Sequence, residues 1–359
     1  MPPVGAGRTN EDAVMAEITT DKPQQTAKSK GLSDRQKDII QKFAAVGSLI
    51  ILAAIFSVTS SAFMTVNNAM TIALQVTSIA LLGIGATYVI ITGGIDLSVG
   101  SVLALAGVVA ALAVKELSLP IPLAMLLGIL TGSLCGLING FVITRLKLPP
   151  FIATLGMMLI ARGVALQITG ARAVSGLGES FGVLGNGSLF RIESIDEQGF
   201  PVVTFPGIPY PVVLMIVIAI AAALVLNRTV LGRHIYAIGS NAEAARLSGV
   251  NVARVTAFTY IVSGTLAGLT GCVLMSRLVT AQPNEGVAYE LDAIASAVIG
   301  GTSLIGGVGT ISGTFIGSFV IGILRNGLNM NGISAFTQQI IIGLVILVTV
   351  WIDQMRNRR

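Results

Sequence analysis

Apolar segments of roughly 20 residues recur along the chain, and they constrain its fold more than any other feature does. A helix needs about 20 apolar residues to cross the ~30 Å hydrocarbon core of a bilayer. Only 11% of the residues are charged, whereas a soluble domain averages about 25%. The pattern predicts an all-α, polytopic helical membrane protein with about ten transmembrane or re-entrant helices. The expected segments are 43–63, 70–92, 96–114, 119–143, 150–170, 208–226, 255–276, 292–303, 307–325 and 333–352.

Lysine and arginine are distributed unevenly between the two sides of these segments. With a cytoplasmic N-terminus, the inside segments near membrane ends hold fourteen Lys and Arg residues and the outside segments hold four. This excess obeys the positive-inside rule and predicts that both termini are cytoplasmic. Residues 171–208 then form an external loop, and residues 227–254 form a cytoplasmic loop. The polar residues 1–38 are expected to be a disordered cytoplasmic tail, and residues 39–359 the transmembrane domain.

Two glycine-rich stretches interrupt the apolar segments. Residues 93–100 read GGIDLSVG and residues 300–307 read GGTSLIGG, with four of eight positions identical and no gap. Paired glycine-interrupted segments in corresponding halves of a chain indicate the broken helices of transporter binding sites. Their freed backbone groups are tolerated only where protein or a water-lined cavity covers them. The candidate residues are Gly93, Gly94, Asp96, Ser98, Gly300, Gly301, Thr302 and Ser303.

Asp96 is a carboxylate inside a long apolar run, which is costly in lipid and usually indicates function. One interpretation is a helix cap. If the next helix starts near Leu97, Asp96 accepts hydrogen bonds from the backbone N–H of Ser98 or Val99. Ser303, at the matching position of the second stretch, is also a favoured cap. The other interpretation is direct contact with a polar solute, and the sequence leaves both open.

Polar side chains in other apolar segments also have two interpretations. They could line a solute path, since uncharged amides suit neutral hydroxyl groups, or they could join helices by hydrogen bonds worth about 0.6 kcal/mol on average. Arg162 could pair with Asp96 or extend towards the interface. Glycines at every fourth position from Gly128 to Gly140 allow close helix packing, within the chain or between two copies. The polar candidates are Asn139, Asn326 and Asn329, together with Gln75, Thr154 and Gln338.

The loop 227–254 contains the stretch SNAEAARLSGV, which has the signals of a short helix. Ser240 is the expected N-cap, Glu243 its capping-box partner and Gly249 the stop. A helix of two turns is too short to be stable in water by itself, so it needs a surface to dock against. Its small alanine side chains permit a close approach to a groove. The candidate coupling residues are Ser240, Asn241, Glu243, Ala244, Ala245 and Gly249.

Several long stretches resemble the permease subunits of ribose-type ABC sugar importers, the branch that handles ribose, xylose, arabinose, galactose and related solutes. The stretches extend from about residue 65 to the C-terminus and include ITGGIDLSVGSVLALAG, LPPFIATLGMMLIARG, GRHIYAIGSNAEAARLSGVNV, AQPNEGVAYELDAIASAVIGGTSLIGGVGTISGTFIG and LRNGLNMNGIS. The resemblance implies a bacterial inner-membrane location, cytoplasmic ABC ATPase subunits and a periplasmic sugar-binding protein. It also implies a second permease copy, as a homodimer or with a related permease.

The sequence contains no GxxxxGK[ST] phosphate loop and no Gly-Lys dipeptide, so we expect a transport subunit and not an enzyme. ATP and Mg²⁺ are expected on the partner ATPase, with no cofactor or metal on this chain and no nucleic-acid partner. The favoured function is import of ribose or a related pentose, while inositol, another monosaccharide and autoinducer-2 stay open. An ion-coupled secondary transporter is the alternative class. It usually needs several membrane carboxylates, whereas Asp96 is the only one expected well inside a span.

Overall fold

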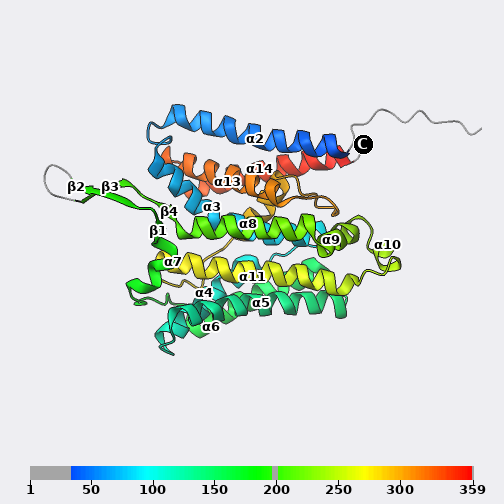
Figure 1. Cartoon of the computed structure of the whole chain (residues 1–359). Coiled ribbons are helices and arrows are strands. Elements are labelled where there is room, and N and C mark those ends of the chain that lie inside the picture. Colours follow the sequence, from blue (N-terminus) through cyan, green and yellow to red (C-terminus); the bar gives the residue numbers. More distant parts are fainter. Residues whose placement is uncertain (1–33, 196–200, 358–359) are drawn as a thin grey trace, which may run out of the picture. The chain divides into compact units, whose positions relative to one another are not determined.

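A computed structural model describes residues 34–195 and 201–357 of the chain (Figure 1). The chain divides into two compact units, Met1–Asp38 and Ile39–Arg359, and the fold below is that of the second unit. The tail expected over residues 1–38 lies outside the described residues as far as residue 33, and helix α2 begins at Asp34.

Each of the ten predicted apolar segments contains a helix. These helices are α2 (Asp34–Thr59), α3 (Val66–Ile91), α4 (Val99–Lys115), α5 (Ile121–Arg145), α6 (Pro150–Thr169), α8 (Tyr210–Arg228), α11 (Val252–Leu278), α12 (Tyr289–Ile299), α13 (Ile311–Met330) and α14 (Ala335–Asn357). Among the described residues, six of them are long and apolar enough to cross a membrane, namely α3, α5, α6, α8, α11 and α13. Helix α12 has only 11 residues, too few to cross a bilayer alone. The structure therefore confirms a mostly helical polytopic membrane protein.

The two long loops carry elements of their own at opposite ends of the membrane helices (Figure 1). Between α6 and α8 the chain forms η1 (Glu179–Gly182), α7 (Val183–Asn186), β1 (Ser188–Leu189), β2 (Ile192–Ile195), β3 (Pro201–Phe205) and β4 (Ile208–Pro209). Strand β2 pairs antiparallel with β3, and β1 pairs antiparallel with β4. Between α8 and α11 the chain forms α9 (Val230–Ser240) and α10 (Ala242–Leu247). The all-α expectation thus holds for the membrane part, and the first loop adds two small sheets.

Prolines set the start of three membrane helices. Pro120, Pro149 and Pro209 are the N-cap residues of α5, α6 and α8, and each helix has a further proline in its first two positions. Proline suits these positions because the first N–H groups of a helix lack an intrahelical acceptor and the fixed φ of proline matches the helix. The prolines therefore mark where each of these three helices begins.

Helix α3 is the buried centre of the unit. Every residue from Val76 to Ile91 is buried, and α3 packs against α8, α11, α12 and α13. Helix α6 instead exposes large apolar side chains such as Leu159 and Ile160, as expected of a surface that faces lipid. A helix that is apolar on all sides can lie in the buried centre or at a lipid-facing surface. The packing of neighbouring helices therefore decides which helix is central.

A glycine stripe joins α5 to α11. A Cβ on Gly132 would overlap the carbonyl oxygen of Gly264, and a Cβ on Gly136 would overlap that of Tyr260. Small residues let two helix backbones approach closely, which favours association inside a membrane. The close packing expected of this stripe is thus made within one chain.

We expect Gly132→Ala to destabilise the fold, because its methyl group would meet the backbone of Gly264 and Gly268. Overpacking of this kind costs about 1–3 kcal/mol. The matched control is Gly163→Ala on α6, where nothing lies within 4 Å of an added Cβ. Alanine there should leave stability unchanged or raise it slightly, since alanine favours the helix. Thermal unfolding of both variants in one detergent measures the difference, and equal midpoints would contradict the close α5–α11 contact.

Candidate functional site

Helices α3 and α12 end in the same hydrogen-bonded motif. Gly93 and Gly301 have φ angles of 79° and 97°, in the left-handed region that glycine enters without strain. The N–H of the following residue, Gly94 or Thr302, donates to the carbonyl oxygen five residues earlier, over 3.1 and 2.9 Å. These Schellman motifs satisfy carbonyl groups at the helix ends. They match Gly93 to Gly301, whereas the sequence alignment paired Gly93 with Gly300, because the second helix continues one residue further before it turns.

The two breaks, residues 92–98 and 300–310, lie against each other. The N–H of Gly307 donates to the carbonyl oxygen of Ile91, the last residue of α3, over 2.8 Å. A backbone group freed by one break is therefore satisfied by the other, which is how non-helical backbone is tolerated at membrane depth.

Helix α9 packs against the point where the two breaks meet. Gly239, near its end, packs so closely that a Cβ there would overlap the carbonyl oxygen of Ile91. The hydroxyl of Tyr236, one turn earlier, donates to the carbonyl oxygen of Gly309 over 2.7 Å. The loop 227–254 is thus in direct contact with both breaks.

Asp96 is 3% exposed and accepts three hydrogen bonds. Its Oδ1 accepts from the backbone N–H and the hydroxyl of Ser98, over 3.0 and 2.6 Å. Its Oδ2 accepts from the hydroxyl of Ser263 on α11, over 2.8 Å. Asn139 on α5 donates to the same Ser98 hydroxyl over 3.0 Å. This network ties the first break to α5 and α11, and it places Asn139 beside the break.

The predicted hydrogen bond from the Ser98 N–H to Asp96 is confirmed, but the helix boundary was wrong. Helix α4 begins at Val99, and its N-cap residue is Ser98. The N-cap of α13 is Thr310 and not Ser303. Ser303 accepts instead from an N–H two residues later. A short polar side chain can make such a bond in a turn without starting a helix, so each helix starts further along than the caps suggested.

Among the described residues, Arg162 bonds to backbone carbonyl groups and not to Asp96. Its Nη1 donates to the carbonyl oxygens of Pro283 and Glu285, over 2.5 and 2.7 Å. The guanidinium therefore holds the segment before α12 against α6. Carbonyl oxygens substitute here for the carboxylate that the sequence pairing assumed.

Two further predicted residues contact polar groups of the protein. The amide of Asn326 on α13 donates to the side chain of Asn68 on α3, over 3.0 Å. The hydroxyl of Thr154 on α6 lies 3.2 Å from the carbonyl oxygen of Ile95 in the first break and 3.0 Å from that of Pro150 in its own helix. Asn326 therefore matches the interhelical interpretation, and the Thr154 hydroxyl lies among backbone carbonyl oxygens.

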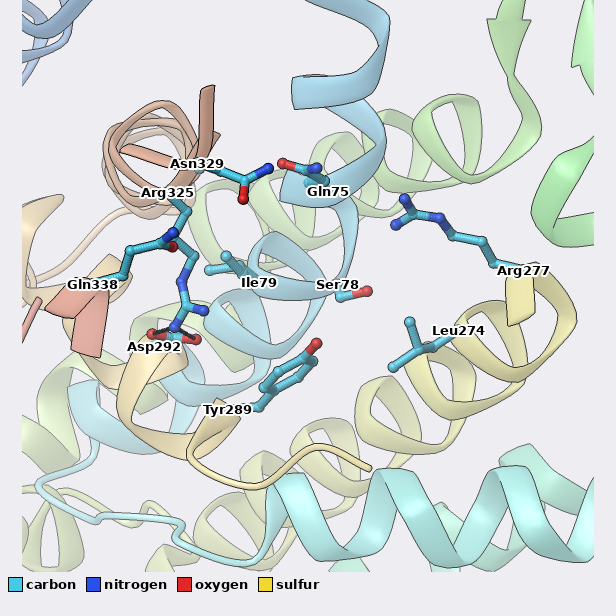
Figure 2. A pocket seen from close by; sticks show the side chains of 11 residues that line it. Gln75, Ser78, Ile79, Leu274, Arg277, Tyr289, Asp292, Arg325, Asn329 and Gln338 are labelled. Atoms are coloured by element: carbon cyan, nitrogen blue, oxygen red, sulfur yellow. Dashed lines mark hydrogen bonds and ion pairs between the residues drawn. The ribbon is translucent and has the colours of Figure 1, made fainter. Parts of the chain in front are cut away.

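A polar cavity of about 230 Å³ lies between α3, α11, α12, α13 and α14 (Figure 2). It brings together the predicted residues Asn329, Gln75 and Gln338, from three different helices. Its lining residues are Gln75, Ser78, Ile79, Leu274, Arg277, Tyr289, Asp292, Gly322, Arg325, Asn329 and Gln338.

A buried ion pair forms one wall of the cavity (Figure 2). The Nη2 of Arg325 on α13 lies 2.8 Å from Oδ1 and 2.7 Å from Oδ2 of Asp292 on α12. The Asp292 side chain is 4% exposed and that of Arg325 is 34% exposed. The carboxylate is thus buried behind the guanidinium, and the pair carries no net charge.

Asp292 and Arg325 were not among the predicted site residues, and Asp96 is not the only buried carboxylate among the apolar helices. The sequence did carry a signal, because Asp292 lies at the start of one predicted apolar segment and Arg325 at the end of the next, and charges within membrane segments usually pair. Asp292 stands near the start of α12, where it could have been taken for a residue of the preceding loop. Only the packing of α12 against α13 shows that it is buried.

The short helix of the loop 227–254 differs in detail from its prediction. The N-cap of α10 is Asn241, whose Oδ1 accepts from the Ala244 N–H over 2.9 Å, while Ser240 is the last residue of α9. Glu243 does not close a capping box. It pairs with Arg246 over 2.6 Å, and this hydrogen bond lowers the pKa of Glu243.

The end of α10 follows the prediction, but its alanines do not share one surface. Gly249 has a φ of 87° and ends the helix, as expected. Ala244 is exposed, whereas Ala245 is buried in the chain's own apolar core. Leu247 is the large apolar side chain that α10 exposes, at 75%.

We expect Asp96→Asn to assemble normally, because an amide oxygen can keep both Ser98 bonds and the Ser263 hydroxyl can rotate to accept. Asp96→Leu should fail, since each buried donor left without a partner costs about 1–3 kcal/mol. The yield of monodisperse protein and its thermal midpoint measure the effect. Loss of assembly in Asp96→Asn would show that the negative charge itself is required.

The chain is similar to known transport proteins along nearly its whole length. Residues 68–350 match the family described as branched-chain amino acid transport system / permease component. The ribose import permease protein of Bacillus subtilis (strain 168) is 41% identical over 335 residues, which are 92% of this chain and 99% of that protein. The ribose import permease protein of Haemophilus influenzae is 44% identical, over 85% of this chain and 91% of that protein.

The xylose transport system permease protein of Escherichia coli (strain K12) is 34% identical, over 92% of this chain and 96% of that protein. No solved structure matches the chain. The resemblance seen in the sequence is confirmed by these relatives. The chain therefore belongs to the family of transport-system permease components, as a multi-pass membrane transport subunit and not an enzyme.

Proposed function

We propose that the chain is the membrane permease of an ATP-driven, binding-protein-dependent importer of ribose or a related pentose. The observation that carries this proposal is the 41% identity over 99% of the Bacillus subtilis ribose import permease. Similarity to the xylose permease is lower, at 34%. The same machinery could serve inositol, another monosaccharide or autoinducer-2, and these are the alternative cargoes.

The charge distribution supports a bacterial inner-membrane orientation with both termini in the cytoplasm. The loop 171–208 then faces the periplasm and offers a contact for the sugar-binding protein. One wall of the cavity lies near this side, because Arg277 is at the end of α11, where the side-chain amide of Asn186 on α7 donates to the Arg277 carbonyl oxygen over 3.0 Å.

The two related glycine-rich breaks are proposed to be the moving part of the solute path, within about ten transmembrane or re-entrant helices. One contact between the breaks is the backbone hydrogen bond from the N–H of Gly307 to the carbonyl oxygen of Ile91. Asp96 and Ser98 hold one side of this contact, and Thr302 with Ser303 belongs to the other.

The loop 227–254 is proposed to receive the stroke of the cytoplasmic ABC ATPase subunits through α10. Helix α9 carries Tyr236 and Gly239, which contact the breaks, and it is followed directly by α10. A displacement of α10 would therefore be transmitted to the breaks through α9. A second permease copy, identical or related, is expected to complete the importer.

An ion-coupled secondary transporter is the competing class, and the buried carboxylates argue against it. Asp96 is occupied by three hydroxyl and N–H donors, and Asp292 is paired with Arg325. Each carboxylate is thus held by groups of the protein, and the charge of Asp292 is also paired.

Uptake into proteoliposomes tests the function. The full chain, reconstituted with its ATPase subunits and its binding protein, should take up labelled ribose only with ATP. Uptake should persist when the proton gradient is collapsed, and the permease alone should hydrolyse no ATP. Uptake that follows the proton gradient without ATP would contradict the proposal, and competition by xylose or inositol would rank the cargoes.

The surface of α10 generates a second test, in which two neighbouring alanines serve as a matched pair. Ala244→Trp, at an exposed position, should leave the thermal midpoint unchanged but reduce uptake by preventing ATPase docking. Ala245→Trp should instead lower the midpoint, because Ala245 is 5% exposed in the chain's own core and overpacking costs about 1–3 kcal/mol. Normal ATPase binding and uptake by Ala244→Trp would place the coupling surface elsewhere.

A further inference from the structure

We infer that the polar cavity between α3, α11, α12, α13 and α14 is a solute-binding site of the permease itself, and that it takes a neutral polyhydroxylated molecule of monosaccharide size. The inference rests on the proposed import function and names the place where the solute is held. It assigns the contacts to the amides of Gln75 and Asn329, the hydroxyl of Tyr289 and the guanidinium of Arg325.

The size of the cavity suits a small solute. Its volume of about 230 Å³ lies below the ≈ 300–1,000 Å³ of pockets for drug-sized ligands. It corresponds to roughly eight water molecules at ≈ 30 Å³ each. A monosaccharide, which carries about as many polar groups as it has carbon atoms, can replace such a water cluster.

Polar groups without internal partners line the cavity (Figure 2). Within residues 34–195 and 201–357, no side chain or backbone group forms a hydrogen bond with the side-chain polar atoms of Gln75, Asn329 or Tyr289. Gln75 and Tyr289 are half-buried and Asn329 is exposed, so all three groups are accessible to a solute in the cavity. A polyol supplies both donors and acceptors, so it can satisfy all three groups at once.

The ion pair in the cavity wall favours a neutral solute. Arg325 uses Nη2 for both bonds to Asp292, which neutralises its charge. Because its side chain is 34% exposed and that of Asp292 only 4%, the guanidinium and not the carboxylate is accessible. The pair thus offers N–H donors without a net charge. Ile79 and Leu274 supply apolar surface for the C–H groups of a sugar ring.

Arg277 is the remaining charge in the cavity wall, and no salt bridge pairs its side chain within the described residues. Figure 2 shows it entering from the side opposite Arg325. If this charge governed the site, an anionic sugar acid would bind best. Ribonate, the aldonic acid of ribose, therefore separates the two chemistries.

Equilibrium binding to the full chain in lipid nanodiscs, without ATPase or binding protein, tests the inference. Labelled ribose should bind, and unlabelled ribonate at the same concentration should displace little of it. Gln75→Leu, Asn329→Leu and Tyr289→Phe should each weaken binding about three- to tenfold, the range expected for losing one hydrogen bond between neutral groups. Gln167→Leu, the same change at an exposed position of α6, should have no effect.

Each result decides the question. Wild-type affinity in all three cavity variants would overturn the location, and displacement by ribonate as strong as that by ribose would overturn the neutral class. Tyr289→Phe removes only a hydroxyl, so weaker binding with an unchanged thermal midpoint excludes misfolding as the cause. If the complete importer takes up ribose in proteoliposomes while the chain alone binds none, the cavity site is wrong and the import function stands. If no wild-type importer takes up sugar, the import function fails whatever the cavity binds.

Discussion

Backbone groups freed inside a membrane must find partners within the protein, and this requirement organises the centre of the molecule. Both broken helices end in left-handed glycines, which return some hydrogen bonds to the helix that has just ended. The carbonyl oxygen of Ile91 is instead satisfied by Gly307 of the other break. Gly239 packs against the same contact. The breaks therefore cannot be placed independently, and the loop that contains α9 is attached to them by the same requirement.

Charged side chains inside the helical unit also need partners within the protein, and they find three different kinds. Asp96 is satisfied by hydroxyl and N–H donors, Arg162 by backbone carbonyl oxygens, and Asp292 by Arg325. In the first two cases the bonds hold neighbouring segments of the chain together. The third leaves part of a guanidinium facing a cavity. That difference, rather than the presence of a charge, separates the structural centre from the proposed solute site.

Much of the fold could be predicted because it depends on local patterns. Apolar length gave each membrane helix, and the glycine pairs gave both breaks. Within the sites, the bond from Ser98 to Asp96 and the stop at Gly249 were also local and were found. The partner of Arg162 was not, because a carbonyl oxygen leaves no trace in residue type. The burial of Ala245 was missed for a similar reason, since it depends on which face of α10 packs against the unit.

The sequence by itself determined the class of the protein, its membrane helices, the positions of the breaks and the family, because each of these follows from runs of neighbouring residues. Only the tertiary structure decided which polar residues act together. Asn139 joins the Asp96 network, whereas Asn329 faces the cavity with Asp292 and Arg325. All of them are polar residues in apolar helices, and the sequence gives no reason to separate them. Their roles differ because helix packing satisfies one group with internal partners and leaves the other open to a solute.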